Sequence, residues 1–368
     1  MSIRSVSNHV ALNETPIQRS RYARLPLAIA GLLLTAQAQA FLPTPASLVT
    51  TGELALNADD STNKNTDNNA KAETAAEIDT KQLLASWREQ AKTENLAQHT
   101  TWRRLLYFSD DKKGLFSKNK NISMIDDASF FLSPNGRKDS DAELDAMLVA
   151  FAEEMAATTN NTKANKAVQT TTNSNSVLCR FPARAQWLSD TLGIDKAAMQ
   201  VDCPELTAWM QKLAPEQLSI MFAQEYLDNP LSAFAHTLLR IDSKAGVADP
   251  NQIHHAYALN DTVDGDTKDN FVLYVIKSMT GGYNNLIEID PYPEKLAKYL
   301  QDDERDVWTY RLDLTPEEVQ QIILHVWETK DFKLPYYFTS DNCASEILRL
   351  IDVVRPEQHL LSQLPYAV

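Results

Sequence analysis

The sequence predicts an α+β protein, with a mainly helical part over residues 81–214 and a mixed part of helices and strands over residues 215–368. In the first part, apolar residues recur at helical spacing. In the second part, short β-branched and aromatic runs alternate with turns rich in Asn, Asp and Gly, which is typical of strands. Only 9 of the 368 residues are glycine, which argues against a Gly-rich nucleotide-binding architecture.

The N-terminus has the pattern of a cleavable targeting segment. Three arginines over residues 19–24 precede an apolar run over 25–34, and an Ala-x-Ala site at 38–40 follows. The apolar run is short for a bilayer-spanning helix, so an uncleaved anchor is the weaker alternative. We therefore expect a signal peptide over residues 1–40 and a mature periplasmic chain that begins at Phe41.

The chain is strongly acidic, with a formal net charge of −14 at pH 7. Removal of the arginine-rich N-terminus makes the mature chain more negative still. Such a charge disfavours binding to nucleic acid or to anionic lipid head groups through bulk electrostatics. It fits a soluble protein of the periplasm.

Two low-complexity stretches interrupt the pattern. Residues 41–80 are rich in Ala, Asn, Asp and Thr and have no apolar period, so they are expected to form a disordered spacer. Residues 158–176 are rich in Asn, Thr and Lys and are expected to form a mobile loop.

The helical part carries two clear apolar patterns. One runs over residues 140–155, where Ser140 and Glu143 fit a capping box and the apolar side chains lie on one face. The other covers residues 181–213. Both patterns predict helices that pack into a core.

The mixed part contains several predicted elements in sequence. Runs that fit strands cover residues 218–222, 234–241, 253–259, 271–276 and 307–312. Thr315, Pro316 and Glu318 then mark the start of a helix. A short aromatic strand near Tyr336 leads through a polar turn into a helix whose first turn holds Cys343.

The three cysteines divide into a pair and a single thiol. Cys179 and Cys203 are close in sequence and flank one helical segment, so we expect a disulfide between them in an oxidising compartment. Cys343 is left unpaired. The unpaired N–H groups and the dipole of a helix N-terminus favour the thiolate, which makes Cys343 a candidate nucleophile; a small buried core residue is the alternative reading.

A thiolate nucleophile needs a base, which is usually a histidine that is distant in sequence. His236 lies within a predicted strand whose neighbours are apolar, and His255 lies at the start of the next predicted strand. Both are candidates for the site.

Five ordered motifs resemble one known family. They are residues 229–242, similar to "SxFGHTFLRID"; Gly281-Gly282-Tyr283, similar to "GGY"; residues 304–310, similar to "E-x-RD-x-W-x-Y"; Trp327-Glu328; and the aromatic run at 336–338 that leads to Asn342-Cys343. Together they resemble the Lnb-type periplasmic domain family, strongly over about residues 215–365. Two positions depart from its pattern, namely Ala235 in place of the usual Gly and Ala344 after the cysteine.

The resemblance implies a fold and a chemistry. The family is implicated in bacterial lipoprotein N-acylation, and its plan is similar to permuted, NlpC-type papain-like folds, with a small antiparallel sheet and a Cys-bearing helix. It implies Cys343 as nucleophile and His236 as base. His255 is our choice for the third, orienting residue, since permuted relatives place a polar residue there; an exposed histidine at a strand edge is the alternative.

Other residues of the motifs have two readings each. Glu304 and Arg305 either clamp a substrate or, as we favour, form a buried ion-pair network. Asn342 caps the helix or supplies an oxyanion donor, and capping is favoured. Tyr337 belongs to the core or contacts an acyl chain. The spacing of His, Cys and Asp residues predicts no metal site, and the sequence calls for no cofactor.

These observations predict a periplasmic thiol acyltransferase that works through an acyl-thioester. Its expected partners are a phospholipid acyl donor and a lipoprotein, at the outer face of the inner membrane or among envelope proteins. A papain-like amidase acting on envelope peptides and a non-catalytic envelope interaction protein are the alternatives. Relatives usually continue beyond Val368, so a shortened family member is expected.

Overall fold

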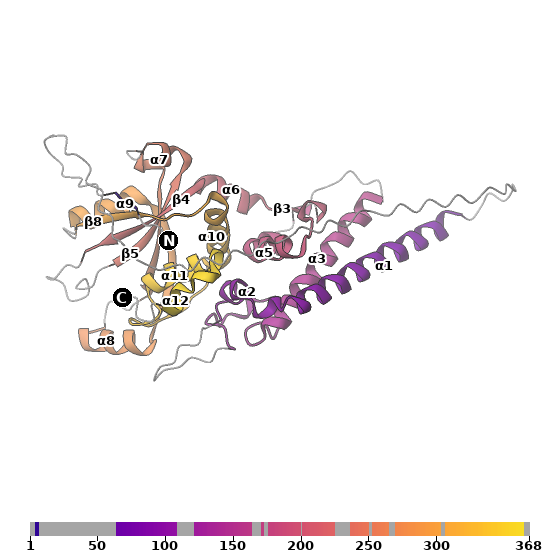
Figure 1. Cartoon of the computed structure of the whole chain (residues 1–368), viewed down its shortest axis with the longest axis horizontal. Coiled ribbons are helices and arrows are strands. Elements are labelled where there is room, and N and C mark those ends of the chain that lie inside the picture. Colours follow the sequence, from indigo (N-terminus) through magenta and orange to yellow (C-terminus); the bar gives the residue numbers. More distant parts are fainter. Residues whose placement is uncertain are drawn as a thin grey trace, which may run out of the picture.

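The computed structural model describes residues 4–6, 64–108, 121–163, 171–172, 176–199, 201–224, 236–249, 252–264, 269–302 and 306–363. An elongated helical part and a sheet-centred part lie end to end (Figure 1). Helices and strands therefore segregate along the chain as the sequence predicts, and the protein is a mixed α and β structure.

The helical part is built from six helices. They are α1 (Lys64–Thr93), α2 (Thr100–Leu105), α3 (Ser140–Lys163), α4 (Val177–Arg180), α5 (Pro182–Leu192) and α6 (Pro204–Leu213), of which α6 leads into the second part and packs in its core through Trp209, Met210 and Leu213. The long helices α1 and α3 run side by side (Figure 1). Trp102, Phe130, Leu148 and Phe151 are fully buried in the core of this part.

Three expectations for the helical part need correction. The predicted spacer over 41–80 is too long, because α1 begins at Lys64, in a stretch rich in helix-forming Ala, Glu and Lys. Helix α3 continues to Lys163, into the predicted loop. The Ser140 capping box is wrong: Asp139 caps the helix through its carboxylate, which accepts from the N–H groups of residues 141 and 142 at 3.0 Å.

A seven-stranded sheet, entirely antiparallel, forms the centre of the second part. Its strands are β1 (Arg4–Val6), β4 (Pro215–Ala223), β5 (His236–Ser243), β6 (Tyr257–Asp264), β7 (Tyr283–Pro291), β8 (Val307–Arg311) and β9 (Leu334–Tyr336), in the order β1-β8-β4-β5-β6-β7-β9. Strand β1 lies before the expected cleavage site, so six strands remain in a processed chain. A separate two-stranded sheet pairs β2 (Thr171–Thr172) with β3 (Val201–Asp202).

Helices cover both faces of the large sheet. Helices α10 (Pro316–Thr329) and α11 (Cys343–Val354) pack on one face, in a core that includes Leu239, Ile322 and Leu350. Helix α9 (Tyr292–Ala297) packs near the other, where Leu238 and Tyr292 are buried. Two short helices, α7 (Lys244–Ala248) and α12 (Leu360–Gln363), complete this part.

One predicted strand is a helix. Residues 271–276 belong to α8 (Phe271–Thr280). The run of Val, Leu, Tyr and Ile fits a buried strand, but Asn270 caps its start by accepting from the N–H of Leu273 at 2.9 Å, and Gly281 ends it with φ of 77°. The strand predicted over 253–259 begins late, at Tyr257, and β7 was not predicted.

The two parts are joined through buried polar groups. Glu328 accepts from the backbone N–H of Arg184 at 2.9 Å, and Arg184 also pairs with Glu143 at 3.2 Å. The indole N–H of Trp327 donates to the carbonyl of Cys179 at 2.8 Å. The Trp327-Glu328 motif therefore docks α10 onto the helical part.

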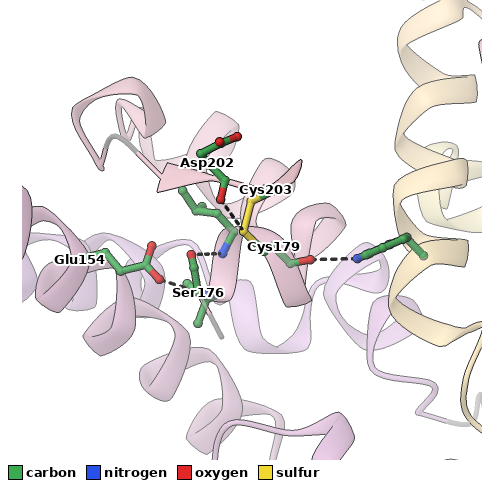
Figure 2. The surroundings of a disulfide bond; sticks show 8 residues. Glu154, Ser176, Cys179, Asp202 and Cys203 are labelled. Carbon is green, nitrogen blue, oxygen red and sulfur yellow. Dashed lines mark hydrogen bonds between the residues drawn. A yellow bond between two sulfur atoms is a disulfide. The ribbon is translucent and has the colours of Figure 1, made fainter. Parts of the chain in front are cut away.

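The predicted disulfide is confirmed. Cys179 and Cys203 are bonded, with their Cα atoms 5.3 Å apart (Figure 2). Ser176 caps the helix that carries Cys179, and the carboxylate of Glu154 accepts from the N–H of Val177, the first residue of that helix, at 3.0 Å. The bridge thus ties α4 to the residue before α6. Cys343 is the free cysteine.

Candidate functional site

The candidate site is built around the first turn of α11. Asn342 caps this helix: its side-chain oxygen accepts from the N–H of Ser345 at 3.0 Å, and the Ser345 hydroxyl accepts from the N–H of Asn342 at 2.8 Å. The favoured capping role of Asn342 therefore agrees with the structure. Cys343 follows as the first helical residue, and it is partly exposed although the helix behind it is largely buried.

Strand β5 supplies the groups that contact the thiol. Its second residue, Thr237, donates a hydroxyl hydrogen bond to Cys343 Sγ at 3.4 Å. His236, the first residue of the strand, also hydrogen-bonds to the thiol. The motifs single out Cys343 and His236, which are more than one hundred positions apart in the sequence. The structure brings these two residues together.

These contacts change the acidity of the thiol. Burial raises the pKa of Cys343, but the hydrogen bond and positive charge of His236, together with hydrogen bonds from Thr237, outweigh it and lower the pKa from 9.0 to about 7. At pH 7 a pKa of 9.0 leaves about 1% of a thiol ionised, whereas a pKa of 7 leaves about half. The contacts of the site therefore favour the thiolate at neutral pH.

Asn260 on β6 orients the histidine. Its side-chain oxygen lies 2.6 Å from Nε2 of His236, and its Nδ2 donates to the hydroxyl of Thr262 at 2.6 Å. Because the amide nitrogen is used by Thr262, the amide oxygen faces the ring and accepts from Nε2–H. This tautomer leaves the lone pair of Nδ1 available to take a proton.

The chain of hydrogen bonds continues outward. Thr262 donates to Glu288 on β7 at 3.1 Å, and Glu288 also pairs with Lys295 on α9 at 3.2 Å. Both hydrogen bonds of this relay run in the same direction: Asn260 donates to Thr262, and Thr262 donates to the carboxylate of Glu288. The relay therefore fixes which way the Asn260 amide points.

A buried acid, Asp261, lies near the thiol. Burial raises the pKa of Asp261 well above its usual range, and the charges of Glu346 and Cys343 raise it further, while Arg349 opposes them. Its carboxyl accepts from Asn285 at 2.7 Å. Burial raises the pKa of Tyr336 as well, and nearby Tyr274, Cys343 and Asp261 raise it further. The low-dielectric wall of the site therefore disfavours the charged forms of both groups.

The first turns of α11 are fixed by the helical part. Tyr107 donates to Glu346 at 2.6 Å, and Arg349 pairs with Glu346 at 3.1 Å and with Asp341 at 3.3 Å. All of these side chains are buried. These buried ion pairs and hydrogen bonds thus hold the helix that presents the thiol. One of the partners, Tyr107, comes from a segment more than two hundred residues earlier.

The third residue that we predicted is wrong in its position. His255 is an exposed residue of a short 3-10 turn, Ile253–His255, and not of the strand. The group that contacts His236 is Asn260, five positions later. The signal that identifies it is the polar run Asn260-Asp261-Thr262 inside an otherwise apolar, mostly buried strand.

The remaining predicted site residues, Tyr337, Glu304 and Arg305, have different outcomes. Tyr337 lies against Gly281, at which a Cβ atom would come within 2.4 Å of the Tyr337 ring, so Tyr337 packs in the turn that leads to the thiol. Glu304 and Arg305 lie outside the described residues. Within the described ranges, no three His, Cys, Asp or Glu side chains are grouped to hold a metal ion. Among the residues that the structure describes, no helix has the length and hydropathy of a membrane span.

Two family models match stretches of the chain. Residues 205–368 match the Lnb N-terminal periplasmic domain, and residues 94–191 match a domain of unknown function, DUF7843. The first match spans strands β4 to β9 and the helices α10 and α11, and it includes Cys343, His236 and Asn260. Comparison with curated proteins and with solved structures gave no significant match.

Proposed function

Residues 205–368 form an Lnb-type periplasmic domain, and on this basis we propose that the protein is a Cys/His acyltransferase of the bacterial periplasm that acts in lipoprotein N-acylation. The observation that supports the proposal is the arrangement of Cys343, His236 and Asn260, which gives a thiol pKa of about 7. A Cys–His–Asn set is also used by papain-like enzymes. A Cys-bearing helix packed on an antiparallel sheet fits the permuted papain-like plan.

In the first half-reaction, His236 takes the proton of the Cys343 thiol. The thiolate attacks the carbonyl carbon of an acyl ester, for which a membrane phospholipid is the proposed donor. The ester C–O bond breaks, and the leaving alkoxide takes the proton from His236. An acyl-thioester on Cys343 and a lysophospholipid result. The backbone N–H groups at the start of α11 are the proposed donors to the oxyanion.

In the second half-reaction, the N-terminal amine of a lipoprotein attacks the thioester carbonyl. The amine gives a proton to His236, the C–S bond breaks, and the released Cys343 thiolate takes that proton from His236. An amide is the product. Asn260 acts throughout by holding the His236 ring in one tautomer, which is a positioning role.

A hydrolase is the second candidate, because the same three residues carry out amide hydrolysis in papain-like enzymes and Cys343 is partly open to solvent. The difference lies in the group that accepts the acyl chain, which is water in a hydrolase and an amine in a transferase.

The test uses the processed chain incubated with phospholipid vesicles, followed by mass spectrometry of the Cys343 peptide. We expect an acyl adduct that hydroxylamine removes and that an added peptide with a free N-terminal amine converts to an amide. Cys343→Ser and His236→Ala are the controls and should form no adduct. Cleavage of envelope peptides, with no acyl adduct on wild-type protein, would support the hydrolase instead.

A further inference from the structure

Helix α8 carries its large apolar side chains outward. Five of them are between 39% and 66% exposed, namely Val272, Leu273, Val275, Ile276 and Met279. In the part of the chain that the structure describes, exposed large hydrophobic side chains occur on this helix alone. At the helical repeat they cover a continuous arc of about 160°. The helix is therefore amphipathic with its apolar face in solvent.

The opposite face of α8 is anchored beside the thiol. Ser278 is buried, and its carbonyl accepts from the N–H of Phe338 at 2.9 Å, in the turn that leads to Cys343. The ring of Tyr274 lies 5.5 Å from that of Tyr283. Whatever binds the outer face of α8 therefore lies at the edge of the candidate site. Figure 1 shows α8 at the margin of the sheet-centred part.

The charge of α8 indicates a neutral partner. Over residues 269–282 the sequence holds one cation, Lys277, and one acid, Asp269. These two pair at 2.6 Å, and Lys277 also lies over the ring of Tyr283. The outer face thus presents apolar groups, and the charges of Lys277 and Asp269 compensate each other.

The size of the face argues against a second copy of the chain. A ten-residue helix is about 15 Å long and about 10 Å wide, which gives a footprint on the order of 150 Å². Stable protein–protein interfaces bury about 800 Å² on each partner. A short apolar helix lying in the surface of a bilayer needs no such area, since lipid closes around each side chain.

We propose that α8 is an interfacial helix that inserts its outer face into a neutral phospholipid bilayer next to the thiol site. This inference rests on the proposed acyl-transfer function, because the acyl ester that Cys343 attacks then lies in the same membrane surface. Helix α8 would bring the mouth of the site to the depth of the ester groups.

Vesicle flotation with the processed Cys343→Ser protein tests the docking independently of chemistry. We expect it to float with phosphatidylcholine vesicles at both low and high salt, because apolar insertion is insensitive to screening. The Val272→Ser/Ile276→Ser variant should partition at least about tenfold more weakly. Leu206→Ser on α6, at the opposite end of this part in Figure 1, is the matched control and should float like the parent.

Three results would overturn the proposal. They are no flotation of the parent protein, equal flotation of the α8 variant, or binding to anionic vesicles only at low salt. A concentration-dependent dimer in sedimentation that the α8 variant abolishes would assign the face to a second copy instead. Adduct formation on wild-type Cys343 from a soluble short-chain ester, measured separately, tests the proposed function without the membrane.

Discussion

The bonded cysteines and the free cysteine of this protein occupy opposite surroundings. Cys179 and Cys203 close a bridge in the helical part, where the Cys179 carbonyl also accepts from Trp327 at the joint between the two parts (Figure 2). Cys343 stands at a helix N-terminus, where it accepts a hydrogen bond from Thr237 and shares one with His236. One set of contacts holds parts of the chain together, and the other changes the acidity of a sulfur atom.

The difference teaches that hydrogen-bond donors, and not burial, separate the two roles. Burial alone would raise the pKa of the Cys343 thiol and make it inert. The donors on β5 reverse that effect. Substitutions in the two regions should accordingly affect different measurements, stability in one and reactivity in the other.

The largest expected effect comes from the nucleophile. Cys343→Ser should reduce acyl transfer by about 10³-fold or more, because a serine hydroxyl is not ionised at neutral pH. Stability should change little, since the volume is similar and serine is tolerated at a helix start. Adding His236→Ala should cost no further activity, because the pair acts as a unit. Activity assays and thermal melts check these statements. Full activity in Cys343→Ser would contradict the role of Cys343 as the nucleophile.

The disulfide should show the converse behaviour. The bridge joins residues 24 positions apart, so Cys179→Ala/Cys203→Ala should lower the free energy of unfolding by about 3 kcal/mol. Denaturant unfolding of the unreduced proteins measures this. The alkylation rate of Cys343 should stay at the wild-type value in native conditions. A variant that unfolds normally but loses Cys343 reactivity would show that the two regions are coupled.

A smaller effect is expected from the relay behind His236. Thr262→Val keeps the shape but removes the acceptor for Asn260 and the donor to Glu288, so the Asn260 amide can turn and the His236 tautomer is no longer fixed. We expect kcat to fall about tenfold, with the acidic limb of its pH profile displaced. Thr262→Ser should restore both. An unchanged pH profile in Thr262→Val would mean that the relay is only structural.

Much of the fold and the disulfide could be predicted because their signals are local. Periodicity gave the helical part, and two cysteines with a spare one gave the bridge. Helix α8 was predicted as a strand because Val, Ile and aromatic residues fit both structures, and only Asn270 and Gly281 at its ends distinguish them. The capping box at Ser140 failed because Glu143 is instead used by Arg184 in the core.

The site was predictable to the extent that its motifs are continuous. Cys343 and His236 each stand in a recognisable run of residues. Asn260 could not be found in this way, because its role depends on the register of β5 and β6, which places it beside His236 only in the folded sheet. The resemblance to permuted relatives favoured His255, which lies exposed in a 3-10 turn before the strand begins.

The most direct test of the account is the pH dependence of Cys343 alkylation in the unreduced, processed protein. The thiol pKa is lowered on folding, so reactivity should be present above pH 7 and be lost as pH falls through about 7. In His236→Ala the midpoint should rise to 9.0 or above, because burial then acts with less opposition. A wild-type midpoint near 9, or the same midpoint in both proteins, would contradict the claim that His236 activates Cys343.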